Sequence, residues 1–190
     1  MKHIFATIIA TAGIAFGLHA ADEPAALAQH PAVYYNTLPK KGYAGQVGVE
    51  MMAPGAYQNG STNFGISTVQ GAMVTWRHFV GAGVAYLHDF TAEQGLIPVF
   101  AEGRIYFPSQ KARIYPYIGV RLGGAFATEG GSGFYGAAAA GIRVPVGLRY
   151  GLSVEIGPQI MPSFTRATPS DPYTHDGSDY AFFARVNFSF

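Results

Sequence analysis

Apolar and polar side chains alternate with a period of two from Gly42 to the end of the chain. The segment 96–107 is typical, since Val99 and Ile105 share one parity while Glu102 and Arg104 share the other. Successive side chains of a strand point to opposite faces, so this period predicts strands. Residues typical of turns separate eight such segments. They cover 42–53, 61–74, 78–89, 96–107, 113–126, 133–145, 150–161 and 179–190.

The mid-strand charges indicate which face points outward. Each lies opposite the aliphatic face of its own segment; they are Glu50, Glu102, Arg104, Arg121, Arg143, Glu155 and Arg185. A charge on the lipid side near the bilayer midplane costs about 2–4 kcal/mol, so the aliphatic face is expected to be the outer one. About 11 tilted strand residues span roughly 28 Å, enough for the apolar band of such a barrel. The pattern predicts an all-β fold, an eight-stranded antiparallel up-and-down transmembrane β-barrel.

The second and third segments fit this pattern less well. Val69 and Met73 have the opposite parity to Phe64 and Ile66, so aliphatic residues fall on both faces of the second segment. Two interpretations remain open at this point. Either a β-bulge shifts the register there, or the assignment of faces is wrong.

The seven inward charges comprise three carboxylates and four guanidinium groups. An eight-stranded barrel is only wide enough to be filled by side chains, and buried ions need partners. We therefore expect a buried network of salt bridges, in which replacing Arg121 or Arg143 with Met would loosen the core. The alternative interpretation of the same charges is a selective pore or a catalytic cluster.

The N-terminal region predicts export. Met1 to His3 form a short basic start, an apolar run continues to Phe16, and small residues precede Asp22. This layout is typical of a secretory signal peptide, which we assign to 1–20 with cleavage near Ala20. Residues 21–41 are expected to form a short periplasmic arm, and 42–190 the barrel. No cysteine is present, so neither disulfides nor a lipoprotein anchor is expected.

Several strings carry a family resemblance, including "IPVFAEGRIYF", "ARIYPYIGVRLGGAF", "GFYGAAAAGIRVPV" and the ending "FARVNFSF". They resemble the small outer-membrane β-barrel proteins of Bacteroidota, which are similar in architecture to OmpA/OmpX-type barrels. The resemblance covers Lys41 to Phe190. It implies an outer-membrane location, and it implies that Phe188 and Phe190 belong to the signal read by the barrel assembly machinery. It implies no reaction, and the chain lacks the peptidoglycan-binding domain of a full OmpA-type protein.

Charge and composition exclude some functions. The chain has 12 Lys and Arg against 11 Asp and Glu, and no basic stripe, so nucleic acid is not an expected partner. No HxxH or HExxH spacing occurs, and we expect neither a metal nor a cofactor. A lipid-modifying hydrolase would need a nucleophile, a base and an acid; His88 and Asp89 with Ser163 or Ser178 could be combined only by free choice. We predict no enzyme activity.

The last loop is the candidate contact site. With the arm and the C-terminus in the periplasm, the loop 162–178 faces outward, and it contains Asp171, Tyr173, His175 and Asp176. Loops on rigid scaffolds carry recognition, although a solvated connector is the alternative. The predicted function is an integral outer-membrane protein, in contact with lipid, that has a structural or surface-interaction role. The alternatives are a narrow channel or transporter, a lipid-modifying enzyme, and a soluble lipocalin-like binder with the reverse arrangement of faces.

Overall fold

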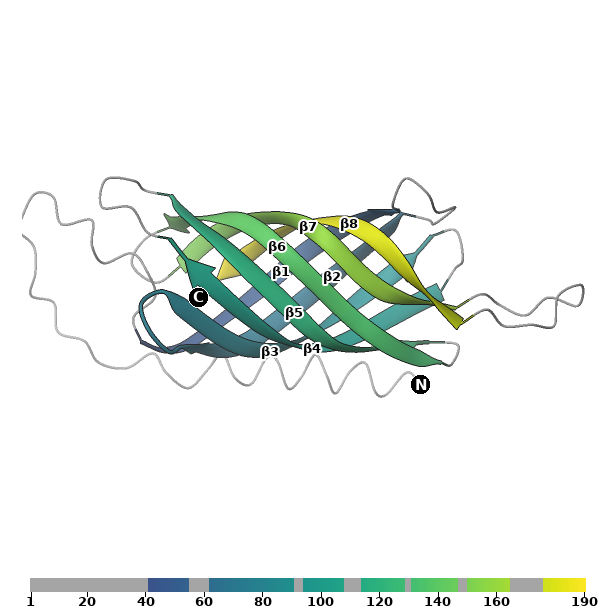
Figure 1. Cartoon of the computed structure of the whole chain (residues 1–190). Helices are drawn as coiled ribbons and strands as arrows, with labels where there is room; N and C mark the ends of the chain where they lie inside the picture. Colours follow the sequence, from purple (N-terminus) through teal and green to yellow (C-terminus); the bar gives the residue numbers. More distant parts are fainter. Residues whose placement is uncertain are drawn as a thin grey trace, which may run out of the picture. The chain divides into compact units, whose positions relative to one another are not determined.

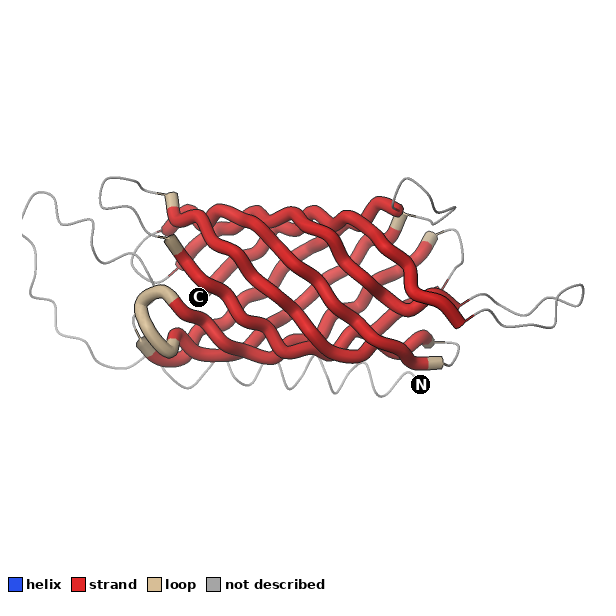
Figure 2. Tube along the Cα trace, viewed as in Figure 1, coloured by secondary structure: helices blue, strands red, loops and turns tan. Residues whose placement is uncertain are grey.

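A computed structural model describes residues 41–54, 62–90, 94–107, 114–128, 131–146, 150–164 and 176–190. Every strand is antiparallel to its neighbours in sequence, and β1 pairs with β8 to close the barrel (Figure 1). Figure 2 shows that strands make up nearly all of the described chain. The strands are β1 (Gly42–Pro54), β2 (Asn63–Met73), β3 (His78–Asp89), β4 (Gln94–Tyr106), β5 (Tyr115–Ala127), β6 (Ser132–Val146), β7 (Tyr150–Phe164) and β8 (Asp176–Ser189).

The fold class predicted from the sequence is confirmed: the chain forms an eight-stranded antiparallel up-and-down barrel of the transmembrane kind. The predicted signal peptide 1–20 and all of the predicted arm except Lys41 lie outside the described residues. In the part of the chain that the structure describes, no helix is long and apolar enough to cross a bilayer.

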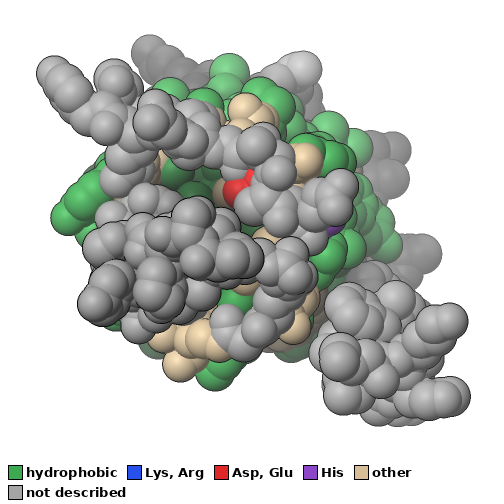
Figure 3. Space-filling model, turned by 90° about the vertical axis from the view of Figure 1, so that its right-hand side faces the viewer, with side chains coloured by type: hydrophobic (Ala, Val, Ile, Leu, Met, Phe, Trp, Pro, Cys, Tyr) green, Lys and Arg blue, Asp and Glu red, His purple; other side chains and the backbone are tan. Residues whose placement is uncertain are grey.

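The two faces of the barrel differ sharply in chemistry. On β5, the outward Ile118 and Leu122 are 51% and 58% exposed, whereas the inward Tyr117 and Arg121 are 2% and 4% exposed. The same alternation runs along the other strands, and apolar side chains surround the end of the barrel in Figure 3. The interior therefore holds the charges, and the aliphatic side chains cover the outside.

The irregular parity of β2 does not come from a bulge. Pairing with β1 runs from Gly42 opposite Met73 to Met52 opposite Asn63 with no inserted residue. Val69 and Met73 point into the barrel and are almost completely buried. The assumption that aliphatic side chains always point outward is therefore wrong for this strand. The interior accepts these side chains because it has an apolar part, in which Met73 packs with Phe79.

The strands next to the last loop extend further than the sequence predicted. β7 continues to Phe164 and β8 begins at Asp176, and the two remain paired to these ends. The predicted loop 162–178 is thus shorter, because residues at both of its ends belong to the sheet. Pro162 is no barrier to this extension, since its position opposite Ser178 is part of the ladder.

Candidate functional site: the filled lumen

Six of the seven predicted lumen charges form one connected group, which we call the lumen network. Glu102 is joined to Arg104 on its own strand, and its second oxygen accepts from Arg121 Nε at 2.8 Å. All side chains of the group are at least 96% buried. The members are Glu50 on β1, Glu102 and Arg104 on β4, Arg121 on β5, Glu155 on β7 and Arg185 on β8.

Glu155 is the centre of the lumen network. Its Oε1 lies 2.5 Å from Arg185 Nη1 and 3.1 Å from Arg121 Nη2, and its Oε2 lies 3.2 Å from Arg104 Nη2. The hydroxyl of Tyr117 also donates to Oε2 at 2.7 Å. One carboxylate thus contacts three guanidinium groups and a phenol, which offsets the cost of burying it.

The register of the strands explains why these charges meet. Glu102 lies directly opposite Arg121 on β5, and Glu155 lies directly opposite Arg185 on β8. Arg185 is also opposite Glu50 on β1, to which it is bonded. Opposite-charge pairs directly across a ladder stabilise a sheet. The lumen network therefore consists of three cross-strand pairs on the inner face, linked across the barrel axis by Arg104 and Arg121.

Aromatic side chains cover the guanidinium groups. Arg121 lies 4.8 Å from the ring centre of Phe100, Arg185 lies 4.8 Å from that of Phe183, and Arg104 lies 4.9 Å from that of Tyr117. These distances allow cation–π attraction. Tyr135 packs against Phe100 with ring centres 5.4 Å apart. Apolar and aromatic packing thus adjoins the charged layer and helps to fill the lumen.

Inward glycines make room for the long side chains. A Cβ built on Gly141 would lie 2.6 Å from the Tyr117 ring, and one built on Gly151 would lie 2.6 Å from Arg143 Nε. Glycine in a strand often marks such a close approach. Small residues beside large ones are needed because an eight-stranded barrel has little interior space.

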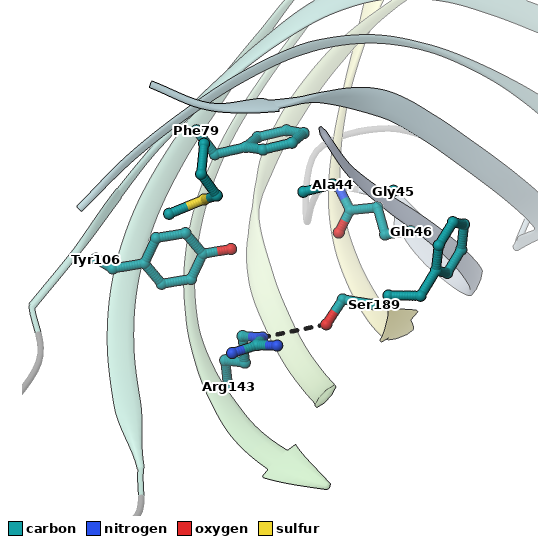
Figure 4. Close-up of a pocket in the computed structure, with 9 residues that line it drawn as sticks. Ala44, Gly45, Gln46, Phe79, Tyr106, Arg143 and Ser189 are labelled. Carbon is teal, nitrogen blue, oxygen red and sulfur yellow. Dashed lines mark hydrogen bonds between the residues drawn. The ribbon is translucent and has the colours of Figure 1, made fainter. Parts of the chain in front are cut away.

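Arg143, the seventh predicted charge, lies in a different place. It lines a recess at the end of the barrel where β8 ends, together with Ala44, Tyr106 and Ser189 (Figure 4). Its Nε donates to Ser189 Oγ at 3.1 Å, and the side chain is almost fully buried. The recess has about 300 Å³ of empty volume, part of which is open solvent. The structure therefore separates Arg143 from the charges with which the sequence grouped it.

Of the remaining predicted site residues, the structure describes Phe188, Phe190 and the backbone of Asp176. Phe188 is on the outer face, stacked on Tyr150 with ring centres 5.5 Å apart. Phe190 exchanges two backbone hydrogen bonds of 3.0 Å with Gly45, so it extends the closing ladder. Asp171, Tyr173 and His175 lie outside the described residues, and only the backbone of Asp176 is described.

Sequence reasoning missed two polar partners of the lumen network. Gln46 Nε2 lies 3.3 Å from Glu102 Oε1, and Tyr117 contacts Glu155 as described above. Both have inward parity in the sequence, but parity alone does not show which carboxylate each one reaches. Among the described residues there is no group of three or more His, Asp or Glu side chains that could hold a metal.

Comparisons with known proteins support the fold. No family model and no curated protein matches the sequence. The structure is similar to that of Neisserial surface protein A, with a TM-score of 0.61 and 11% identity over 77% of this chain and 95% of that chain. The N-terminal β-barrel domain of Pseudomonas aeruginosa OprF covers 77% of this chain and 97% of its own, with 13% identity and a TM-score of 0.46. The first likeness shows the fold, an eight-stranded barrel of the kind that the resemblance to OmpA/OmpX-type barrels implied.

Proposed function

We propose that this protein is an integral outer-membrane barrel that acts as a rigid, non-conducting scaffold and presents its loops at the cell surface. The observation that carries the proposal is the pairing of an apolar outer face with a lumen closed by interlocked ion pairs. The predicted export signal and the fold support the outer membrane as the location. In this proposal the terminal aromatics Phe188 and Phe190 act as the assembly signal.

The outer face supports residence in lipid. Exposed Val, Ile, Leu and Phe side chains lie on it from strand to strand, while the mid-strand charges all point inward. A continuous apolar surface of this extent is far larger than soluble monomers expose. A lipocalin-like binder would need the opposite arrangement, with a polar exterior and an apolar cavity.

The filled lumen argues against a channel and against catalysis. The lumen network connects β1, β4, β5, β7 and β8 across the interior, so a solute would have to break several ion pairs to pass. Breaking one buried pair costs about 3–5 kcal/mol. The same enclosure keeps a substrate away from the three carboxylates. The rims and loops are then the surfaces left for recognition, and we place the contact with an extracellular ligand in the loop that contains Asp171, Tyr173 and His175.

Three measurements test the scaffold proposal. The protein should require detergent for extraction from membranes, and its band should shift on an SDS gel after heating. In planar bilayers it should add no conductance steps, whereas replacing Arg104 and Arg121 together with Ala should produce them. Extraction without detergent would refute residence in the membrane. Conductance steps from the unaltered protein would instead favour a channel.

Surface exposure of the last loop has its own test. Arg166 is the one Lys or Arg between residues 162 and 178. Trypsin added to intact cells should therefore cut the protein after Arg166. The Arg166→Gln variant should stay uncut, provided that its heat-dependent gel shift shows it to be folded. Cleavage at Arg166 that occurs only after the cells are opened would show that the loop faces the periplasm.

A further inference from the structure

The turn between β2 and β3 holds the chain's single tryptophan, Trp76, in a defined conformation. Thr75 organises the turn, because its Oγ1 accepts from the backbone N–H of Arg77 at 3.2 Å and of His78 at 3.1 Å. The backbone oxygen of Arg77 accepts from the Tyr106 N–H at 2.8 Å, which ties the turn to β4. Side chains at the tip are thus presented by a fixed backbone.

Trp76 and Arg77 form an exposed pair at the tip. The guanidinium carbon of Arg77 lies 4.0 Å from the centre of the Trp76 ring, within cation–π range. Trp76 is 50% exposed, and the outward Val74 and Val80 beside it are more exposed still. The apolar outer face of the barrel therefore continues onto the turn, and the Trp76 ring and the Arg77 cation lie at its edge.

The charged side chains described at this end are positive, and the main-chain carboxylate of Phe190, which pairs with Gly45, is the one negative group described there. Lys41 precedes Gly42, which pairs with Met73, so Lys41 reaches the same rim as Arg77 and both are exposed. The described acidic residues lie elsewhere: three are in the lumen network, and Asp89, Asp176 and Asp179 are in the parts of β3 and β8 nearest the opposite rim. Among the described residues, an anionic group would therefore meet two basic side chains and no acidic side chain beside Trp76.

From these observations we propose that the β2–β3 turn is a binding site for the headgroup of an anionic phospholipid. Arg77 and Lys41 would contact the phosphate, since guanidinium donors match its oxygens, and the indole would lie at the boundary between headgroups and acyl chains. The inference rests on the proposed residence in the membrane. With the C-terminus in the periplasm, the bound lipid belongs to the periplasmic leaflet.

Trp76 itself provides the measurement, because it is the only tryptophan. The whole protein is reconstituted into vesicles that contain phosphatidylglycerol or phosphatidylcholine brominated high on the acyl chains, and quenching of Trp76 gives the relative affinity of the two lipids. A basic side chain near an anionic surface is worth about 1 kcal/mol, or roughly fivefold. The unaltered protein should prefer phosphatidylglycerol, and Arg77→Gln should lower that preference by about fivefold.

Asp89→Asn is the matched control, because it also changes the charge by one but at the opposite rim. It should leave the preference unchanged, and both variants should keep the heat-dependent gel shift. Two results would overturn the site while leaving membrane residence intact. One is equal quenching by both lipids in the unaltered protein, and the other is an Arg77→Gln variant whose lipid preference stays within twofold of that of the unaltered protein. Absence of quenching by either lipid would overturn both proposals.

Discussion

Replacing Arg121 with Met tests whether the lumen network stabilises the barrel. Arg121 lies 2.8 Å from Glu102, 3.1 Å from Glu155 and 4.0 Å from Glu50, so its loss removes one cation from among three buried carboxylates. Removing one partner of a buried pair costs about 3–5 kcal/mol. Because Glu102 and Glu155 each keep another guanidinium and Met fills much of the volume, we expect about 3 kcal/mol.

The assay is urea unfolding of the reconstituted protein. At each urea concentration, the folded fraction is measured on an SDS gel as the share of protein whose band still shifts when the sample is heated. With a slope of about 2 kcal/mol per molar urea, the midpoint should fall by about 1.5 M. Arg143→Met is the matched control: it is also a buried Arg, but it lines a recess that is partly open to solvent, and a loss of only about 1–2 kcal/mol is expected there.

A second variant separates charge from packing. Arg121→Met leaves the buried carboxylate of Glu102 with one guanidinium partner fewer. Adding Glu102→Gln removes that carboxylate's charge, so the double variant should regain part of the lost stability, with a coupling energy between the two changes of about 1–2 kcal/mol. The reasoning would be refuted if the Arg121→Met midpoint equalled that of the unaltered protein, or fell no further than that of Arg143→Met.

Three further predictions concern other parts of the barrel. Gly141→Ala should cost about 1–3 kcal/mol in the same unfolding assay, because its Cβ would press on the Tyr117 ring, whereas Gly103→Ala, with nothing within 4 Å, should change stability by less than about 0.5 kcal/mol. Val120→Arg should cost about 2–4 kcal/mol in lipid vesicles, since Val120 points outward near the middle of β5, and a neutral result would contradict the assigned faces. Arg185→Met should reduce the heat-shifted fraction after refolding more than any other single Arg→Met change, because that side chain contacts carboxylates on both neighbouring strands.

The strand count and the faces were predictable because both depend on local periodicity. A period of two is visible within every segment except the second and third, and the parity of each lumen charge in the sequence matches the face on which the structure places it. Strand ends were less predictable: Phe164 and Asp176 belong to the ladder although the sequence between them contains several turn residues. Local turn signals indicate that a reversal occurs, but the pairing of two long strands decides where it begins.

The details of the lumen required information that a single segment does not contain. That Glu155 meets Arg185 depends on the register between β7 and β8, and that Glu50 meets the same Arg185 depends on closure of the first strand against the last. Parity placed Arg143 with these residues, but its position near the end of β6 brings it to Ser189 instead. Parity likewise could not show that the interior has an apolar part that accepts Met73.

The position of Arg185 suggests what the lumen network contributes beyond stability. A slip of β8 by one residue would turn Arg185 to the lipid face, at a cost of about 2–4 kcal/mol. The same slip would turn every other lumen-facing polar side chain of β8 toward the lipid. A slip by two residues would keep the faces but separate Arg185 from both Glu50 and Glu155, leaving buried carboxylates with fewer partners. Apolar residues in these positions would tolerate the second error, because one packed aliphatic pair resembles another. Charges therefore discriminate between registers that packing alone does not, and they do so at the seam where the barrel has to close.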